Sequence, residues 1–61
     1  MNLKNIRLEK NMSQEQLAKE INVDRSTVTK WETGEAMPRA NKLVKLSQIF
    51  NCSIDELLKE G

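Results

Sequence analysis

Four side chains that form hydrogen bonds recur at a spacing that brings them together: Arg25, Ser26, Thr29 and Lys30. Positions i, i+1, i+4 and i+5 share one face of an α-helix, because the helix has about 3.6 residues per turn. None of the four is apolar, so this face suits a hydrogen-bonding surface better than a protein core. The major groove of DNA is such a surface, since its base edges present donors and acceptors to an inserted helix.

Two short helices joined by a tight turn are predicted to position this face, over residues 13–33. Residues 14–21 and 24–33 each place apolar side chains on one side, and residues 22–24 interrupt the pattern. The inward-facing residues are Leu17, Ala18, Ile21, Val28 and Trp31. The small side chain of Ala18 allows the second helix to cross close to the first. Two helices that cross steeply over such a turn form a helix-turn-helix unit.

The run Ser-Gln-Glu-Gln-Leu-Ala (13–18), the run Val-Asp-Arg-Ser-Thr-Val-Thr-Lys-Trp-Glu-Thr-Gly (23–34) and Pro38 resemble the lambda-repressor-like (Cro and Xre-type) helix-turn-helix family. The resemblance extends from Ile6 to Leu58 and so covers nearly the whole chain. It implies an all-α, compact five-helix DNA-binding domain. It also implies double-stranded DNA as the partner.

Arg25 is the first candidate for reading a base. Near the start of the recognition helix, its guanidinium can form two hydrogen bonds with O6 and N7 of guanine. The alternative is a solvated surface arginine. The resemblance implies base contacts at Arg25, Ser26 and Lys30, although Lys30 could equally contact a phosphate. Thr29 either meets a thymine methyl group or touches only the DNA backbone.

Gln14 begins the first helix of the unit, where the family typically uses Gln to contact phosphate. Backbone N–H groups are also free at a helix start, so the amide and the helix terminus together make an anion site. The alternative is that Gln14 is simply a good helix former. Ser13, Thr33 and Arg39 are further phosphate candidates at the rims of the same face. Glu35 departs from the Lys or Arg frequent in the family, and its carboxylate would repel phosphates.

Arg7 and Glu32 resemble the structural ion pair of the family, which links the first helix to the end of the third. We interpret this pair as structural, because removing one partner would leave the other charge buried without a counter-ion. Trp31 could in principle stack on a base. We interpret it as a core residue, because it lies in phase with Val28 on the inner face of its helix.

Three further helices are predicted, over residues 3–10, 39–50 and 54–59. Apolar side chains recur in them at spacings of three and four residues, which gives each helix one inward face. The residues expected to pack inward are Leu3, Ile6, Leu43, Leu46, Ile49, Phe50, Ile54, Leu57 and Leu58. Met12 is expected to be buried in the turn after the first helix.

Helix boundaries carry typical capping residues. Ser13 followed by Gln16, and Ser53 followed by Glu56, have the spacing of capping boxes. Asp24 is expected to accept a hydrogen bond from the backbone N–H of residue 26 or 27. Three helix ends carry an asparagine, a residue that tolerates the left-handed conformation common there: Asn11, Asn22 and Asn51.

The chain has 61 residues, one cysteine and no histidine. This length predicts one domain, residues 1–61, with the helix-turn-helix core at 13–33. Because Cys52 has no histidine to join it, we expect neither a common metal site nor nucleophilic catalysis, and therefore no enzyme and no cofactor. Cys52 is expected to fill the core. The sequence has no run of ~20 apolar residues and no signal-peptide core, so we expect a cytoplasmic protein with no membrane partner.

These patterns favour a sequence-specific transcriptional regulator, most simply a repressor acting as a homodimer on a two-fold operator with half-sites ~34 Å apart. The resemblance and the apolar content place the expected dimer surface at residues 51–58. The alternative is a protein-interaction module of the antitoxin or phage-regulator type, with DNA binding secondary. Glu35 and the net charge of only +1 support the alternative, while residues 1–50 are mildly basic and residues 51–61 acidic overall.

Overall fold

The computed structural model describes residues 1–59, which form five α-helices and no strand. The helices are α1 (Leu3–Glu9), α2 (Gln14–Ile21), α3 (Arg25–Thr33), α4 (Ala40–Phe50) and α5 (Ile54–Leu58). The all-α prediction is confirmed, and each observed helix begins and ends within one residue of its predicted bounds.

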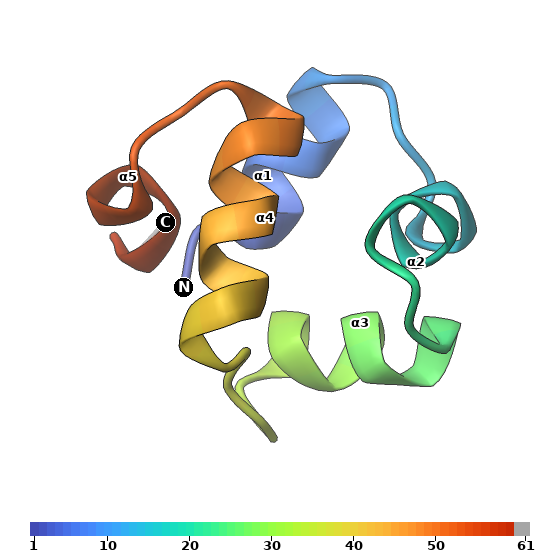
Figure 1. Cartoon of the computed structure of the whole chain (residues 1–61). Helices are drawn as coiled ribbons and strands as arrows, with labels where there is room; N and C mark the ends of the chain where they lie inside the picture. The colour runs from blue at the N-terminus through green and yellow to red at the C-terminus, as the bar shows by residue number, and fades with distance from the viewer. Residues whose placement is uncertain (60–61) are drawn as a thin grey trace.

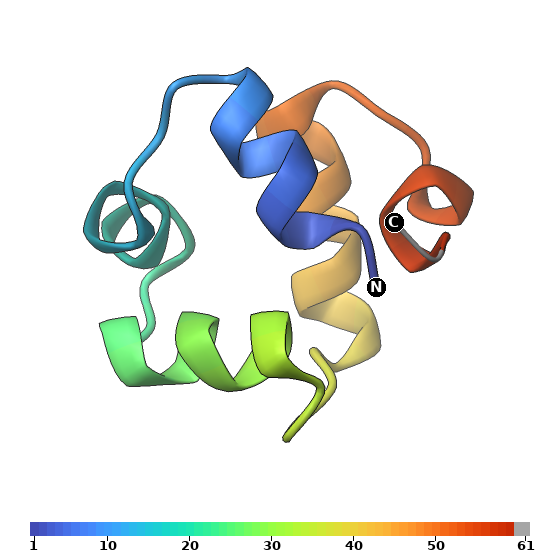
Figure 2. The same ribbon diagram turned by 180° about the vertical axis from the view of Figure 1, so that it is seen from behind.

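The helices are arranged so that α3 lies along one edge of the molecule, at the bottom of Figures 1 and 2. Helix α2 stands beside the start of α3, and α4 rises from the region where α3 ends (Figure 1). Helix α1 packs against α3 and α5, and α5 lies on the side of α4 remote from α2 (Figures 1 and 2). This arrangement leaves one face of α3 uncovered along its length.

The core draws apolar side chains from all five helices. Its buried members are Leu3, Ile6, Leu17, Ala18, Ile21, Val28, Trp31, Leu46, Phe50 and Leu57. Trp31 is only 4% exposed, which confirms its interpretation as a core residue. The expectation that Leu58 packs inward is wrong, since its side chain is 42% exposed. Leu57 occupies the inward position of α5, and the next residue of a helix points about 100° away.

Several partly buried side chains complete the core at its margin. Met12 and Cys52 both pack against the buried cluster, although neither is fully buried. Burial raises the pKa of the Cys52 thiol, the nearby Glu56 carboxylate raises it further, and the Lys10 ammonium group opposes the rise. Cys52 therefore fills a gap at the edge of the core, as expected.

Helix ends use the predicted local chemistry in most places. Asn11, Asn22 and Asn51 all adopt the left-handed conformation, with φ between 53° and 62°. Ser13 and Gln16 form a complete capping box, in which the Gln16 N–H donates to Ser13 Oγ at 3.0 Å. In return, the Ser13 N–H donates to Gln16 Oε1 at 2.8 Å. These contacts fix where the chain enters α2.

Two capping predictions differ from the structure. Asp24 occupies the cap position of α3, but its side chain accepts no hydrogen bond there. The Thr27 N–H instead donates to the backbone carbonyl of Asp24 at 3.0 Å, so the expected donor is already satisfied. At α5, Ser53 Oγ accepts from the Glu56 N–H at 3.1 Å, which is half of a capping box. The Glu56 carboxylate lies 3.7 Å from Lys59 Nζ on the exposed side of the helix.

Contacts between elements join the ends of the fold. The Asn2 N–H donates to the carbonyl oxygen of Leu57 at 2.8 Å, which ties the N-terminus to α5. Lys42 Nζ donates to the carbonyl oxygen of Ile21 at 3.1 Å, which places a positive charge at the C-terminal end of α2.

Within residues 1–59, no helix has the length and apolar character needed to cross a membrane.

Gly34 ends α3 in the left-handed conformation, with φ at 84°. A Cβ atom at this position would meet no other atom within 4 Å, so a substitution tests the backbone conformation alone. We expect Gly34→Ala to lower the free energy of unfolding by about 1–2 kcal/mol in urea denaturation, because a Cβ disfavours this conformation. Gly34→Asn is the matched control and should lose less, since asparagine adopts the same conformation at three other helix ends. An alanine variant as stable as the wild type would contradict this account.

Candidate nucleic-acid interface

The uncovered face of α3 carries the four side chains singled out from their spacing. Arg25, Ser26, Thr29 and Lys30 are all exposed. Among the described residues, the side chains of Ser26 and Lys30 form no hydrogen bond or ion pair, so both are available to an external partner. Arg25 and Thr29 are also engaged within the protein, and both contact the start of α2.

Gln14 is the residue that joins the two helices. Its side-chain oxygen, Oε1, accepts a hydrogen bond from Thr29 Oγ1 at 3.2 Å and a longer one from Arg25 Nε at 3.5 Å. The single hydroxyl hydrogen of Thr29 is shared with the backbone carbonyl oxygen of Arg25, which lies 3.3 Å from Oγ1. Its side-chain nitrogen, Nε2, donates to Glu32 Oε1 at 2.8 Å. The amide of this phosphate candidate therefore connects two base-contact candidates and a member of the predicted ion pair.

Glu32 is held from the other side by Arg7. Arg7 Nε lies 2.7 Å from Glu32 Oε2, and Arg7 Nη2 donates to Glu32 Oε1 at 3.3 Å. A third donor, Arg7 Nη1, bonds to the carbonyl oxygen of Met12 at 2.7 Å. The two side chains are only 8% and 4% exposed, so the pair is buried where it links α1 to the last turn of α3. Arg7 therefore fixes the carboxylate that Gln14 contacts.

The start of α2 offers further donors beside α3. Backbone N–H groups at the first positions of a helix have no acceptor within it, which applies to Gln14 and Glu15. Ser13 Oγ accepts from the Gln16 N–H, so its hydroxyl hydrogen can still be donated outward. Glu15 also lies in this first turn and is exposed. The donors would attract a phosphate group at this position, and the Glu15 carboxylate would repel it.

The remaining candidates lie away from this cluster. Thr33 Oγ1 donates to the carbonyl oxygen of Lys30 at 3.2 Å, so its hydrogen is already used. Arg39 is exposed at the cap position of α4, after the loop that follows α3. Glu35 is exposed in that same loop. The structure thus groups Gln14 with Arg25 and Thr29, and leaves Thr33 and Arg39 at the other end of α3.

Sequence reasoning missed the connection of Glu32 to the exposed face of α3 that carries Arg25 and Thr29. A signal for it was present, because Arg25, Thr29 and Glu32 stand at i, i+4 and i+7 and therefore share one stripe of α3. Gln14 lies along this stripe. Its partner Glu32 is 18 residues away, so the bond itself depends on how α2 and α3 cross.

Comparison with known proteins gives a consistent set of relatives. The sequence matches the helix-turn-helix family over residues 3–57. It is 43% identical over 56 residues to the HTH-type transcriptional activator BcrR of Enterococcus faecalis, a match that covers 92% of the chain and 28% of that relative. It is 40% identical over 47 residues to the cryptic phage CTXphi transcriptional repressor RstR of Vibrio cholerae, covering 77% of the chain and 42% of the relative.

A third relative matches over most of its own length. An uncharacterized HTH-type transcriptional regulator of Archaeoglobus fulgidus is 34% identical over 55 residues, covering 90% of the chain and 78% of the relative. By contrast, the chain spans less than half the length of the Enterococcus faecalis and Vibrio cholerae relatives.

Proposed function

Because the chain belongs to the lambda-repressor-like (Cro and Xre-type) helix-turn-helix family, we propose that it is a sequence-specific DNA-binding regulator of transcription. In this function α3 lies in the major groove and the start of α2 faces the DNA backbone. The observation that carries it is the uncovered hydrogen-bonding face of α3 beside the N-terminus of α2. We propose repression as the direction of regulation, as named for the Vibrio cholerae relative, whereas the Enterococcus faecalis relative is named an activator.

The side chains divide between two roles in this proposal. Arg25 reads guanine through O6 and N7, because it is exposed at the first position of α3. Ser26, Thr29 and Lys30 complete the base-contacting set. The phosphate contacts come from Ser13, Gln14, Thr33 and Arg39, of which only Arg39 carries a charge. Phosphate contacts fix the register of the protein on the duplex, and base contacts supply sequence preference.

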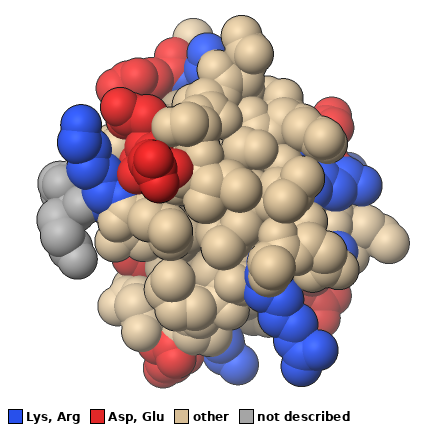
Figure 3. All heavy atoms as spheres, turned by 60° about the vertical axis from the view of Figure 1, so that its left-hand side comes forward, with Lys and Arg blue, Asp and Glu red and all other residues tan. Residues whose placement is uncertain are grey.

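Two copies of the chain bind one operator in this proposal. A single recognition helix reads few base pairs, so specificity benefits from a second copy on a half-site ~34 Å away. The proposed dimer surface comprises residues 51–58, next to α4. Within this surface Leu58 is 42% exposed, and on the neighbouring helix α4 Val44 is 45% exposed. Figure 3 brings the α5 side forward and shows that charged side chains lie mainly around the rim of this face. The surface also carries the carboxylates of Asp55 and Glu56, so its exposed apolar side chains are the feature that suits contact with a second copy.

Binding-site selection from a random duplex library tests this function. We expect the wild type to enrich a two-fold symmetric site, since a dimer imposes its symmetry on the operator. An enriched site without symmetry would contradict the dimer, and no enrichment at all would contradict sequence-specific DNA binding.

The affinity for the selected site should fall steeply with salt. The plot of log affinity against log salt concentration should have a slope of about −1.8 if Arg39 of each copy neutralises one phosphate, from about −0.9 for each phosphate. The slope should be about −3.6 if Lys30 of each copy contacts a phosphate in place of a base. Fluorescence anisotropy with a labelled duplex measures this slope. A flat dependence would show that phosphate contacts contribute little.

The second candidate function is a protein-interaction module in which DNA binding is secondary. Glu35 favours it, because its exposed carboxylate lies in the loop between the end of α3 and Arg39. The net charge of +1 also provides little general attraction to nucleic acid. An empty selection together with a flat salt dependence is the result that this alternative predicts.

A further inference from the structure

The Gln14 amide can face only one way in this structure. The Glu32 carboxylate only accepts hydrogen bonds, and the Arg25 guanidinium only donates them. The amide must therefore turn Nε2 toward Glu32, at 2.8 Å, and Oε1 toward Arg25 and Thr29. Its orientation follows from the chemistry of its neighbours on both sides.

The buried ion pair makes this orientation firm. Glu32 Oε2 is occupied by Arg7 Nε at 2.7 Å, and Oε1 is shared between Arg7 Nη2 and Gln14. Because the Glu32 side chain is only 4% exposed, it has no space in solvent to turn into. The face of α3 that carries Arg25 and Thr29 is thus linked, through the Gln14 amide, to the buried carboxylate of Glu32.

We propose that Glu32 is a positioning residue for base recognition, which acts through Gln14 to hold Arg25 and Thr29 for contact with the DNA. This role rests on the proposed function and adds to it a determinant of specificity that lies inside the protein. The Gln14 amide has two hydrogens, and one of them is donated to Glu32. The other can be donated to a phosphate, so the same orientation serves a backbone contact and the reading side chains.

Substituting Glu32 by glutamine keeps the shape of the side chain and changes the pattern of donors. An amide has one oxygen, and Arg7 Nε at the buried end requires it. The NH2 group of the new amide then faces Gln14, which must turn its own oxygen inward. The NH2 group of Gln14 would now meet the guanidinium of Arg25, donor against donor. Glu32→Gln should therefore release Arg25 from its position.

A charge-conserving exchange restores the original pattern. In the double variant Gln14→Glu/Glu32→Gln, the amide at position 32 donates to the carboxylate at position 14. The second oxygen of that carboxylate can again accept from Arg25 and Thr29. The carboxylate has no hydrogen for a phosphate, so base preference should recover while overall affinity stays low. This separation of two measured quantities is not expected of a residue that only stabilises the fold.

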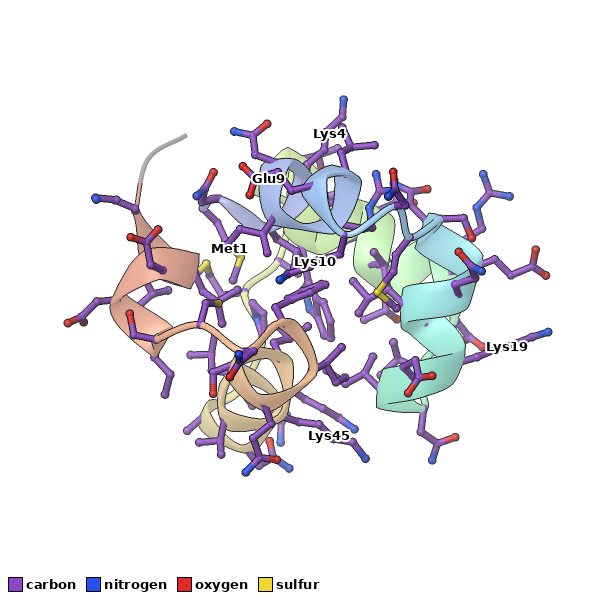
Figure 4. The ribbon with its side chains drawn as sticks, turned by 90° about the horizontal axis from the view of Figure 1, so that it is seen from above. Met1, Lys4, Glu9, Lys10, Lys19 and Lys45 are labelled. Carbon is purple, nitrogen blue, oxygen red and sulfur yellow. The ribbon has the colours of Figure 1, made fainter. Side chains whose placement is uncertain are left out.

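The test measures affinity for the selected site and for duplexes altered at each base in turn. Measurements are made at a temperature where circular dichroism shows each variant to be folded. We expect Glu32→Gln to lower the preference at the base read by Arg25 about tenfold, within the range for one bidentate contact, and the exchange variant to restore it. Glu9→Gln is the control, because it changes the charge by the same amount at an exposed position of α1 (Figure 4).

Each other outcome overturns the proposal at a distinct point. Equal losses at all bases in Glu32→Gln, or a preference that the exchange does not restore, would give Glu32 a structural role alone. If Glu32→Gln does not fold, Gln14→Met removes the same link without touching the ion pair, and an unchanged preference in it would overturn the proposal. A wild type that selects no site would overturn the proposed function itself, and with it this role.

Discussion

Arg7→Ala should lower the free energy of unfolding by about 3–5 kcal/mol, because it leaves the Glu32 carboxylate buried without its cation. Three contacts are lost together: those with Glu32 Oε2, with Glu32 Oε1 and with the carbonyl oxygen of Met12. Native domains have roughly 0.05–0.15 kcal/mol of stability per residue, so a chain of 61 residues has about 3–9 kcal/mol in all. The loss therefore removes at least about a third of this stability, and the variant would be unfolded near room temperature if the wild type lies at the lower end of the range.

Thermal and urea unfolding followed by circular dichroism measure this loss. Lys4→Ala is the matched control, since it removes one positive charge from an exposed position of the same helix and should change stability by no more than about 0.5 kcal/mol. The double variant Arg7→Met/Glu32→Leu removes both charges and should recover much of the loss, because no ion is then stranded in the core. A melting temperature of Arg7→Ala within a degree or two of the wild type would contradict a structural role for the pair.

Much of this fold could be predicted from the sequence because it depends on local patterns. Helical periodicity identified the faces of all five helices, and three asparagines marked left-handed helix ends correctly. The wrong predictions concern positions where another local arrangement was available to the chain. Asp24 does not cap α3 with its side chain, because its own carbonyl satisfies the Thr27 N–H. Leu58 lies outside the core, because the five-residue helix α5 turns only Leu57 inward.

The candidate interface was predictable as a surface but not as a network. Spacing alone places Arg25, Thr29 and Lys30 on one face of a helix, and all three are exposed there. The bonds of Gln14 depend on the crossing of α2 and α3, which no periodicity specifies. Donor and acceptor chemistry becomes decisive only once the crossing is known. From that point the acceptor-only Glu32 and the donor-only Arg25 determine how the amide lies.

Arg25→Ala is expected to remove sequence preference at one base of each half-site while leaving the fold intact. The side chain is exposed, and its 3.5 Å contact with Gln14 lies at the outer limit of a hydrogen bond. This contact orients the side chain but contributes little to the free energy of unfolding, so the stability should change by no more than about 0.5 kcal/mol. Loss of a bidentate contact with guanine should cost ~1–3 kcal/mol of discrimination, which is roughly 5- to 150-fold in relative affinity.

The salt dependence of the same variant separates base reading from phosphate contact. If Arg25 reads a base, the preference at that position disappears and the salt slope stays close to that of the wild type. If Arg25 contacts a phosphate, affinity falls about equally for every sequence and the slope becomes shallower by about one unit for each copy of the chain. Lys4→Ala removes the same charge from α1 and should alter no base preference (Figure 4). A variant that keeps both the preference and the slope of the wild type would make Arg25 a solvated surface residue, and the base contacts would then have to come from Ser26, Thr29 and Lys30 alone.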